Sequence, residues 1–421
     1  MKRTRLRIIV TGLIAQHPHL GGVAWDYLQY AVGLARLGHD VYYFEDSGEW
    51  PYSLDGGLSG NDWVLQDPEP NLKHLSSVLS RYGLGEKWAY HFPLTSRWFG
   101  LGHRQRREVI ETADLLINVS GTLERPADYR RIPRLAYIDS DPVFTQIKLE
   151  LTRGCLSFQK RFAAHDVFFT FGDNVPKTNF RRTWLTTRQP IVLSEWNPSA
   201  ARRETFTTVM SWTSYKPLKF QRRSYGQKDM EFRRFLELPQ KVKPAVLEVA
   251  VGGGFHMNWQ TRSAELPPAI ASLLQAEPSL TPAALLDRTG WRVVDPMKAC
   301  GDLDSYRSYI ESSKAEWSVA KNGYVAGRSG WFSCRSACYL AAGRPVIVQD
   351  TGFQIPVGEG ILAFSSVEQA ADAVREVEAN YGRHSKAARA LAGEYFDSDK
   401  VLDRFVRQAM TSPSEAETVV A

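Results

Sequence analysis

The sequence has little cysteine and no long apolar run. Only four of its 421 residues are cysteines, and no two of them form a C-x-x-C pair. We therefore expect free thiols in a reducing, cytoplasmic protein rather than a disulfide framework. No run of about 18 apolar residues occurs, so we expect no transmembrane helix. The basic start of the chain is interrupted by Arg5 and Arg7, and it predicts a first strand rather than a signal peptide.

A strong excess of charge of one sign is also missing. The formal net charge is +6, and charged residues make up 23% of the chain, as in ordinary globular proteins. Lysine and arginine are scattered, with local clusters only at residues 216–223 and 103–107. A basic surface that steers a small anion explains this charge. We therefore do not expect nucleic acid as the main partner, while peripheral membrane contact stays open.

The strongest local pattern lies in residues 324–353. A glycine-rich loop leads into a helix predicted from about residue 333 to residue 342. Gly343 ends that helix, because glycine adopts a left-handed C-cap at no steric cost. A short apolar strand follows and stops at small polar residues, so loop, helix N-terminus and strand end predict a site for a phosphate-bearing ligand. The residues at this strand end are Asp350, Thr351 and Gly352.

Strands and helices alternate along both halves of the chain. Apolar runs near residues 6–12, 115–119 and 135–138 predict buried strands, and stretches with helical periodicity lie between them. A second series of the same kind begins after residue 204. The alternation predicts an α/β protein with two Rossmann-like, doubly wound parallel-sheet domains facing a cleft. No G-x-G-x-x-G motif occurs, so a dinucleotide fingerprint is not supported.

The domain boundary is predicted near residue 198, where the composition turns polar. We expect a Rossmann-like N-terminal domain over residues 1–198 and a Rossmann-like C-terminal domain over residues 199–400. Residues 401–421 predict a helix, which can pack back on the N-terminal domain, and a disordered tail. Residues 47–105 predict variable loops with one helix near residues 72–82, and residues 190–198 predict a last strand of the first half.

Two segments resemble the GT-B glycosyltransferases of families 1 and 4. Gly21 and Gly22 before a helix, followed by GHDVYYFED, are similar to the opening β–α–β unit of that fold. SACYLAAGRPVIVQDTGF is similar to its donor-binding helix and strand. The resemblance implies transfer of a hexosyl group from a nucleotide-sugar donor, such as a UDP-sugar, to a small-molecule or glycan acceptor. It also implies a donor site in the C-terminal domain, with no bound metal or other cofactor, because a helix N-terminus and basic side chains stabilise the leaving diphosphate.

The sequence departs from this family at the residue that usually holds the donor ribose. The helix glutamate of the family falls on Cys338, and its upstream partner falls on Gly330. We expect Ser333 or Arg335 to take over that contact. Basic residues after the first strand of the second domain are expected to neutralise the donor phosphates. The predicted donor-binding residues are Arg328, Ser333, Arg335, Asp350, Thr351, Gly352, Lys228, Lys321 and Trp212.

The predicted catalytic residues come from the first half of the chain. Asp139 and Asp141 end an apolar strand as a D-x-D motif, which is also the metal signature of the GT-A glycosyltransferases. Because the donor-like motif lies in the other half, we expect no metal here and propose one aspartate as a general base, with a turn cap as the alternative. His19 is the third candidate, because a neutral imidazole suits a base. The acceptor-side loop is predicted to contain His17, Gly21 and Gly22.

Two other classes of protein use the same fold and stay open. A nucleotide-sugar 2-epimerase would isomerise the donor without an acceptor. A non-catalytic nucleotide-sugar-binding protein would lack the helix glutamate, as this chain does. The sequence does not distinguish the base and sugar of the donor, the acceptor, inversion from retention, or the oligomeric state.

Overall fold

The computed structural model describes residues 4–52, 67–151, 156–175, 183–200, 202–252, 268–277 and 280–413. They form two compact units. Unit 1 comprises the chain up to Leu193, Gly301–Asp304 and the chain from Tyr395 on, while unit 2 comprises Ser194–Cys300 and Ser305–Glu394. None of the helices in the described ranges is both long enough and apolar enough to span a membrane.

Unit 1 is built on an eight-stranded sheet with the order β4-β3-β2-β1-β5-β6-β7-β8. All neighbouring strands are parallel except β3 and β4. The carboxyl ends of the parallel strands therefore share one edge, which is where α/β sheets bind ligands. The strands are β1 (Arg7–Thr11), β2 (Asp40–Glu45), β3 (Trp88–Phe92), β4 (Arg97–Gly100), β5 (Leu115–Val119), β6 (Arg134–Asp139), β7 (Val167–Thr170) and β8 (Trp184–Thr186).

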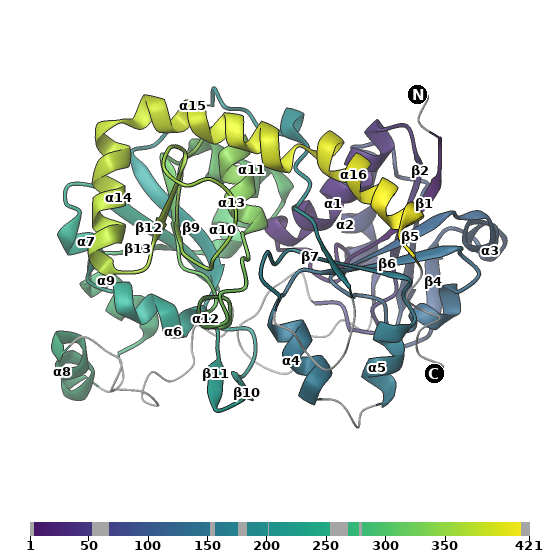
Figure 1. The fold of residues 1–421 in the computed structure, drawn as a ribbon, viewed down its shortest axis with the longest axis horizontal. Helices are drawn as coiled ribbons and strands as arrows, with labels where there is room; N and C mark the ends of the chain where they lie inside the picture. Colours follow the sequence, from purple (N-terminus) through teal and green to yellow (C-terminus); the bar gives the residue numbers. More distant parts are fainter. Residues whose placement is uncertain are drawn as a thin grey trace. The chain divides into compact units, whose positions relative to one another are not determined.

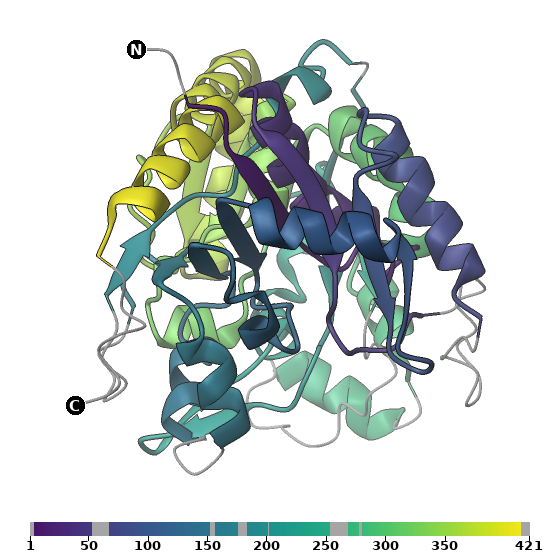
Figure 2. The same cartoon turned by 90° about the vertical axis from the view of Figure 1, so that its right-hand side faces the viewer.

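The C-terminal helix α16 packs on the first helix α1 within unit 1. A Cβ atom on Gly33 of α1 would lie 2.5 Å from a side-chain carbon of Leu402 of α16, so glycine at this position allows the close approach. Figure 1 and Figure 2 both show α16, in yellow, beside α1, in purple. The helices of unit 1 are α1 (Gly21–Arg36), α2 (Glu69–Ser80), α3 (His103–Thr112), α4 (Phe144–Leu151), α5 (Leu156–Ala163) and α16 (Ser398–Thr411), with the 3-10 helix η1 (Pro126–Tyr129).

Unit 2 is built on a six-stranded sheet with the order β13-β12-β9-β14-β15-β16, in which all pairs are parallel. Its core on one face is rich in aromatic rings, including Phe232, Trp291 and Trp317. Trp317 lies in β14, all four residues of which are buried, as expected for a sheet covered on both faces. The strands are β9 (Thr205–Ser211), β12 (Val246–Gly252), β13 (Arg292–Val294), β14 (Ala315–Ser318), β15 (Val346–Gln349) and β16 (Ile361–Phe364).

Helices of unit 2 connect these strands, and a separate β-hairpin lies outside the sheet. The hairpin consists of β10 (Leu218–Phe220) and β11 (Arg223–Tyr225), which pair antiparallel and are labelled in Figure 1. The helices are α6 (Lys228–Phe232), α7 (Leu238–Lys241), α8 (Pro268–Ala276), α9 (Pro282–Arg288), α10 (Pro296–Cys300), α11 (Leu303–Ser312), α12 (Asn322–Ala326), α13 (Cys334–Ala341), α14 (Val367–Ala379) and α15 (Tyr381–Leu391). The short helices η2 (Leu193–Glu195), η3 (Arg233–Phe235) and η5 (Ala392–Phe396) complete the chain as described.

The segment with the strongest local pattern folds as predicted. Helix α13 ends at Ala341, Gly343 has a φ of 66°, and β15 begins at Val346. The apolar runs at residues 115–119 and 135–138 lie in β5 and β6. These predictions are confirmed.

Two predictions of local structure are wrong. Residues 190–198 were expected to form a strand, but only a bridge between Ile191 and Asp397 forms, and Leu193–Glu195 is a 3-10 helix. Residues 47–105 were expected to contain loops and one helix, but they also contain β3 and β4. The turn between these strands has Ser96 at a φ of 52°, so it lacks the glycine that usually signals a hairpin.

Candidate functional site

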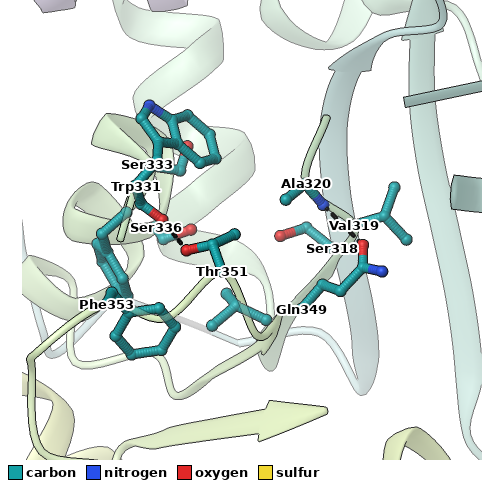
Figure 3. Close-up of a pocket in the computed structure, with 11 residues that line it drawn as sticks. Ser318, Val319, Ala320, Trp331, Ser333, Ser336, Gln349, Thr351 and Phe353 are labelled. Atoms are coloured by element: carbon teal, nitrogen blue, oxygen red, sulfur yellow. Dashed lines mark hydrogen bonds between the residues drawn. The ribbon is translucent and has the colours of Figure 1, made fainter. Parts of the chain in front are cut away.

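A small pocket opens at the carboxyl edge of the unit 2 sheet. It is lined by the ends of β14 and β15, the start of α13 and the loop that precedes α13. Ser318 and Ser336 lie on opposite sides of it in Figure 3. The pocket has a volume of only about 10 Å³, which is room for about one water molecule. It therefore marks the base of a candidate site rather than a space that encloses a nucleotide.

One polar group in this pocket has no partner among the residues the structure describes. The Oγ of Ser336, in the first turn of α13, is completely buried and makes no hydrogen bond. The neighbouring hydroxyl of Thr351 is used, because it donates to the carbonyl of Trp331 at 2.6 Å. A buried hydroxyl without a partner is costly. Ser336 is therefore a candidate for binding a ligand group at the N-terminus of α13, where backbone N–H groups also favour anions.

Arg335, also in the first turn of α13, is largely committed to the protein. Its Nε donates to Oε1 of Glu316 at 2.6 Å, and its Nη1 donates to the carbonyl of Val209 at 2.6 Å. Burial lowers its pKa, but the neighbouring carboxylate of Glu316 outweighs this and raises the pKa overall. Its Nη2 is buried and without a hydrogen bond. Arg335 therefore brings a fixed positive charge to the edge, and its Nη2 is the nitrogen without a partner among the described residues.

Lys228, the first residue of α6, is the basic residue of this edge with the least compensation. Its ammonium group has no hydrogen bond or ion pair with any residue in the described ranges. Burial lowers its pKa far below the usual range, the nearby charge of Arg335 lowers it further, and Glu316 raises it only in part. Lys321 lies close enough to lower the pKa as well. An anion bound here would stabilise the charged form of Lys228 and raise its pKa.

Glu231, which sequence analysis missed, fixes the segment that presents Lys228. Its Oε1 accepts from Nδ2 of Asn322 at 2.8 Å, and its Oε2 accepts from Nε2 of Gln349 at 2.5 Å. A third bond comes from Arg234 at 2.9 Å. The buried carboxylate therefore joins α6, α12 and β15. These residues are far apart in sequence, so no local pattern signals the network.

The other predicted donor residues on this edge have different surroundings. Lys321 donates to the hydroxyl of Tyr215 at 3.3 Å and lies over the Tyr215 ring, 5.1 Å from its centroid. Arg328, which is exposed, pairs with Asp350 at 3.3 Å. Asp350 also accepts from the backbone N–H of Gly352 at 2.7 Å, which shapes the turn after β15. Ser333 caps the start of α13 without a side-chain hydrogen bond to it.

Trp212 is not available to a nucleotide base. Its side chain is only 2% exposed, and its ring packs against Phe232 with the centroids 5.5 Å apart. This is the packing of a core residue. We correct the sequence prediction accordingly and no longer place Trp212 in the donor site.

In unit 1, the carboxylate of Asp139 is fully occupied by the protein. It accepts from Thr145 at 2.7 Å, Gln146 at 2.9 Å, Thr170 at 3.0 Å and the backbone N–H of Asp141 at 3.0 Å. Asp139 is 1% exposed, and burial raises its pKa. This is the geometry of the turn cap that sequence analysis kept as the alternative. Asp141 is half-buried beside it.

The D-x-D motif of Asp139 and Asp141 has little capacity to bind a metal ion. Because both oxygens of Asp139 accept hydrogen bonds from side chains, its carboxylate has little capacity left for a cation. Within the ranges given above, no group of three or more His, Cys, Asp and Glu residues has the geometry to hold a metal ion. The turn that follows contains Val143 at a φ of 74°, which is strained for a β-branched residue.

The loop between β1 and α1, which contains His17 and His19, is hydrogen-bonded to the buried carboxylate of Glu45. The carboxylate of Glu45 accepts the backbone N–H groups of Ala15 at 2.9 Å and Gln16 at 2.7 Å. His17 stacks on Tyr52 with the ring centroids 4.9 Å apart, and burial lowers its pKa to about 4. Its imidazole is therefore neutral at pH 7.

His19 has more freedom to act on a ligand than His17 does. Its Nε2 is buried and has no hydrogen-bond partner among the residues that the structure describes. Gly21 and Gly22, predicted to lie in the acceptor-side loop, instead form the first turn of α1. Gly21 is buried there, so it brings the helix close to its surroundings rather than forming a loop.

No protein-family model and no curated protein matches the chain. Among solved structures, an alpha-glucosyltransferase in complex with UDP and a 13-mer DNA containing a central A:G mismatch has a TM-score of 0.58 at 12% identity, over 96% of this chain and 100% of that one. An alpha-glucosyltransferase in complex with UDP-glucose and DNA containing an abasic site has a TM-score of 0.56 at 13% identity, over 97% and 100%. The chain therefore has the fold of these glycosyltransferases, and the predicted class of two parallel-sheet domains is confirmed.

Proposed function

We propose that the chain is a glycosyltransferase that takes a hexosyl group from a UDP-sugar. The observation that carries this proposal is the ammonium group of Lys228, which has no counter-charge of its own in the described structure and lies near Arg335 and Lys321. The fold agrees with it, because the similar alpha-glucosyltransferases are described with UDP and UDP-glucose.

The diphosphate would lie at the carboxyl edge of the unit 2 sheet. Lys228 would neutralise it as a point charge, and Nη2 of Arg335 would donate to it. The N-terminus of α13 and the hydroxyl of Ser336 would bind a phosphate oxygen. These groups are fixed before the reaction, so they stabilise charge that develops on the leaving diphosphate without a bound metal.

The general base would come from unit 1. His19 fits this role because its Nε2 has no partner among the described residues, and Asp141 is the second candidate. Asp139 would position the turn that carries Asp141, since its own oxygens are occupied. The acceptor is a molecule with a nucleophilic hydroxyl group. A cytoplasmic location is part of the same proposal.

Thermal-shift measurements with UDP, UDP-glucose, GDP and ADP, each with and without EDTA, test the donor. A ligand that binds only the folded state raises the melting temperature of the protein. At a ligand concentration of about a hundred times the Kd, the free energy of unfolding rises by about 2.7 kcal/mol. We expect UDP and UDP-glucose to shift the wild type in the presence of EDTA. Lys228→Met should reduce the shift strongly, whereas Lys298→Met, which removes an exposed lysine of the same unit, should leave it unchanged.

Three results would contradict the proposal. The first is a wild-type protein that no nucleotide stabilises. The second is a shift that appears only with a divalent cation, which would show that nucleotide binding depends on a metal ion. The third is an equal loss in both lysine variants, which would attribute the shift to net charge rather than to the site. Conversion of UDP-glucose to an isomer without an acceptor would instead identify a 2-epimerase.

A further inference from the structure

The β10–β11 hairpin of unit 2 has an unusual concentration of uncompensated positive charge. Between Glu204 and Asp229 the sequence contains no aspartate or glutamate. The hairpin and the residues before it carry four exposed cations, and none of the four forms a hydrogen bond or an ion pair with a described residue. They are Lys216, Lys219, Arg222 and Arg223. An exposed cluster of this kind attracts a polyanion.

Two exposed arginines of unit 1 show the contrast, because they have an acidic partner. In unit 1, Arg107 and Arg131 both pair with the carboxylate of Glu111, at 2.9 Å and 2.5 Å. That surface is therefore partly neutralised by its own acids. The hairpin has no such acids, so its charge remains available to a partner.

The tip of the hairpin keeps arginine at a position that disfavours it. Gln221 has a φ of 47° and Arg222 has a φ of 64°. A two-residue hairpin turn with two positive φ values normally contains asparagine or glycine, because other side chains are strained there. Strained positions of this kind cluster at functional sites, and here the side chain at the tip is a guanidinium group.

The base of the hairpin is attached to the candidate donor site. The hydroxyl of Tyr215, which precedes β10, accepts from Nζ of Lys321. After β11, the backbone N–H of Gly226 donates to Oδ1 of Asn322 at 3.0 Å, and the chain then enters α6 at Lys228. The hairpin therefore projects from the same edge of the sheet at which we place the diphosphate.

We propose that the β10–β11 hairpin binds the phosphodiester backbone of nucleic acid, which it holds beside the donor site. The proposal rests on the proposed function for the position of that site. Arginine forks match phosphate oxygens, and a two-stranded β-ribbon fits the major groove of DNA. No residue of the hairpin is among the large hydrophobic side chains that are exposed in the described structure, which disfavours insertion into a membrane. The sequence-based expectation against nucleic acid noted the basic cluster at residues 216–223 but did not place it on a hairpin.

Binding of a short fluorescently labelled DNA duplex, followed by anisotropy over a salt series, tests the hairpin. The variant is Arg222→Ser with Arg223→Ser, and the matched control is Arg104→Ser with Arg107→Ser on α3, which removes the same charge from unit 1. Each lost phosphate contact reduces the slope of log K against log salt by about 0.9. Between about 50 and 200 mM salt, the wild type should therefore lose about tenfold more affinity than the hairpin variant does. The control pair should keep the wild-type slope.

The same variants are tested for a thermal shift with UDP, which separates this proposal from the donor site. We expect the hairpin variant to keep the wild-type shift. Loss of that shift would assign the hairpin to the donor diphosphate and overturn the proposal. So would an equal loss of DNA affinity in both variants, no binding of the duplex by the wild type at low salt, or binding to phosphatidylserine vesicles but not to DNA. Hairpin-dependent DNA binding without any thermal shift by UDP would support the proposal for the hairpin and contradict the proposed donor site.

Discussion

The carboxyl edges of the two sheets differ in how their polar groups are satisfied. In unit 1, Asp139 accepts four hydrogen bonds from its own turn and its neighbouring strand. In unit 2, Lys228 has no bond of this kind within the described residues, and the hydroxyl of Ser336 has none either. Both edges place a charged residue at the end of a strand or at the start of the following segment, so position alone does not distinguish them.

The difference teaches that the hydrogen bonds and ion pairs of a polar group, rather than its residue type, separate a structural group from a ligand-binding one. A buried charge with all its partners stabilises the fold or does little for it. A buried charge without partners lowers the stability of the free protein and repays the cost only when a ligand supplies the missing partner. On this criterion Asp139 is structural, whereas Ser336 and the half-buried Lys228 are candidates for binding a ligand.

The largest expected effect comes from removing the satisfied carboxylate. Asp139→Ala leaves the buried donors of Thr145, Thr170 and Gln146 without an acceptor, and we expect it to lower the free energy of unfolding by about 3 kcal/mol. Urea denaturation measures this change. Asp139→Asn keeps an acceptor and should cost less. If Asp139→Ala instead left stability unchanged and removed transferase activity, the carboxylate would be catalytic and the comparison between the two edges would be broken.

How far the sequence alone reaches follows the same division. Helix α13 and strand β15 were predictable because their signals are local, namely a glycine with a positive φ and an apolar run after a proline. The sequence predicted Lys228 as a donor-binding residue, which stays a prediction, but its lack of a partner could not be predicted. That depends on Arg335 and Glu316, which are distant in sequence and meet only in the folded sheet.

Trp212 shows the opposite failure. An aromatic residue at the end of a strand can stack on a ligand or fill the core, and the pattern of the strand is the same in both cases. The outcome here depends on Phe232, which α6 brings against its ring. The β10–β11 hairpin was missed because its turn, Gln221-Arg222, contains no turn-forming residue although both residues have positive φ. A turn without glycine or asparagine therefore gives no local signal on which prediction can rely.

A smaller effect is expected in the pH dependence of UDP binding. The pKa of Lys228 is low in the free protein, and a bound diphosphate raises it, so the complex holds more protons than the free protein does. Affinity should therefore fall as pH rises between the free and bound pKa values, by at most about tenfold per pH unit for one proton. Isothermal titration above about pH 7, where the phosphate is already ionised, measures it in two buffers of different ionisation heat. Lys228→Met should give a flat profile. A flat profile in the wild type would show that Lys228 does not meet the diphosphate.

The smallest effect sharpens the comparison most, because its two readouts have opposite signs. Ser336→Ala removes a buried hydroxyl without a partner and places a better helix former in α13, so the free energy of unfolding should stay the same or rise slightly. If the hydroxyl bonds a phosphate oxygen, the same change weakens UDP binding by about 1 kcal/mol, or about fivefold. Thr351→Ala is the control at the same pocket. Its hydroxyl already donates to the carbonyl of Trp331, so its loss should lower the free energy of unfolding more than the affinity for UDP. A Ser336→Ala protein that is less stable but binds UDP normally would make Ser336 a structural residue like Asp139.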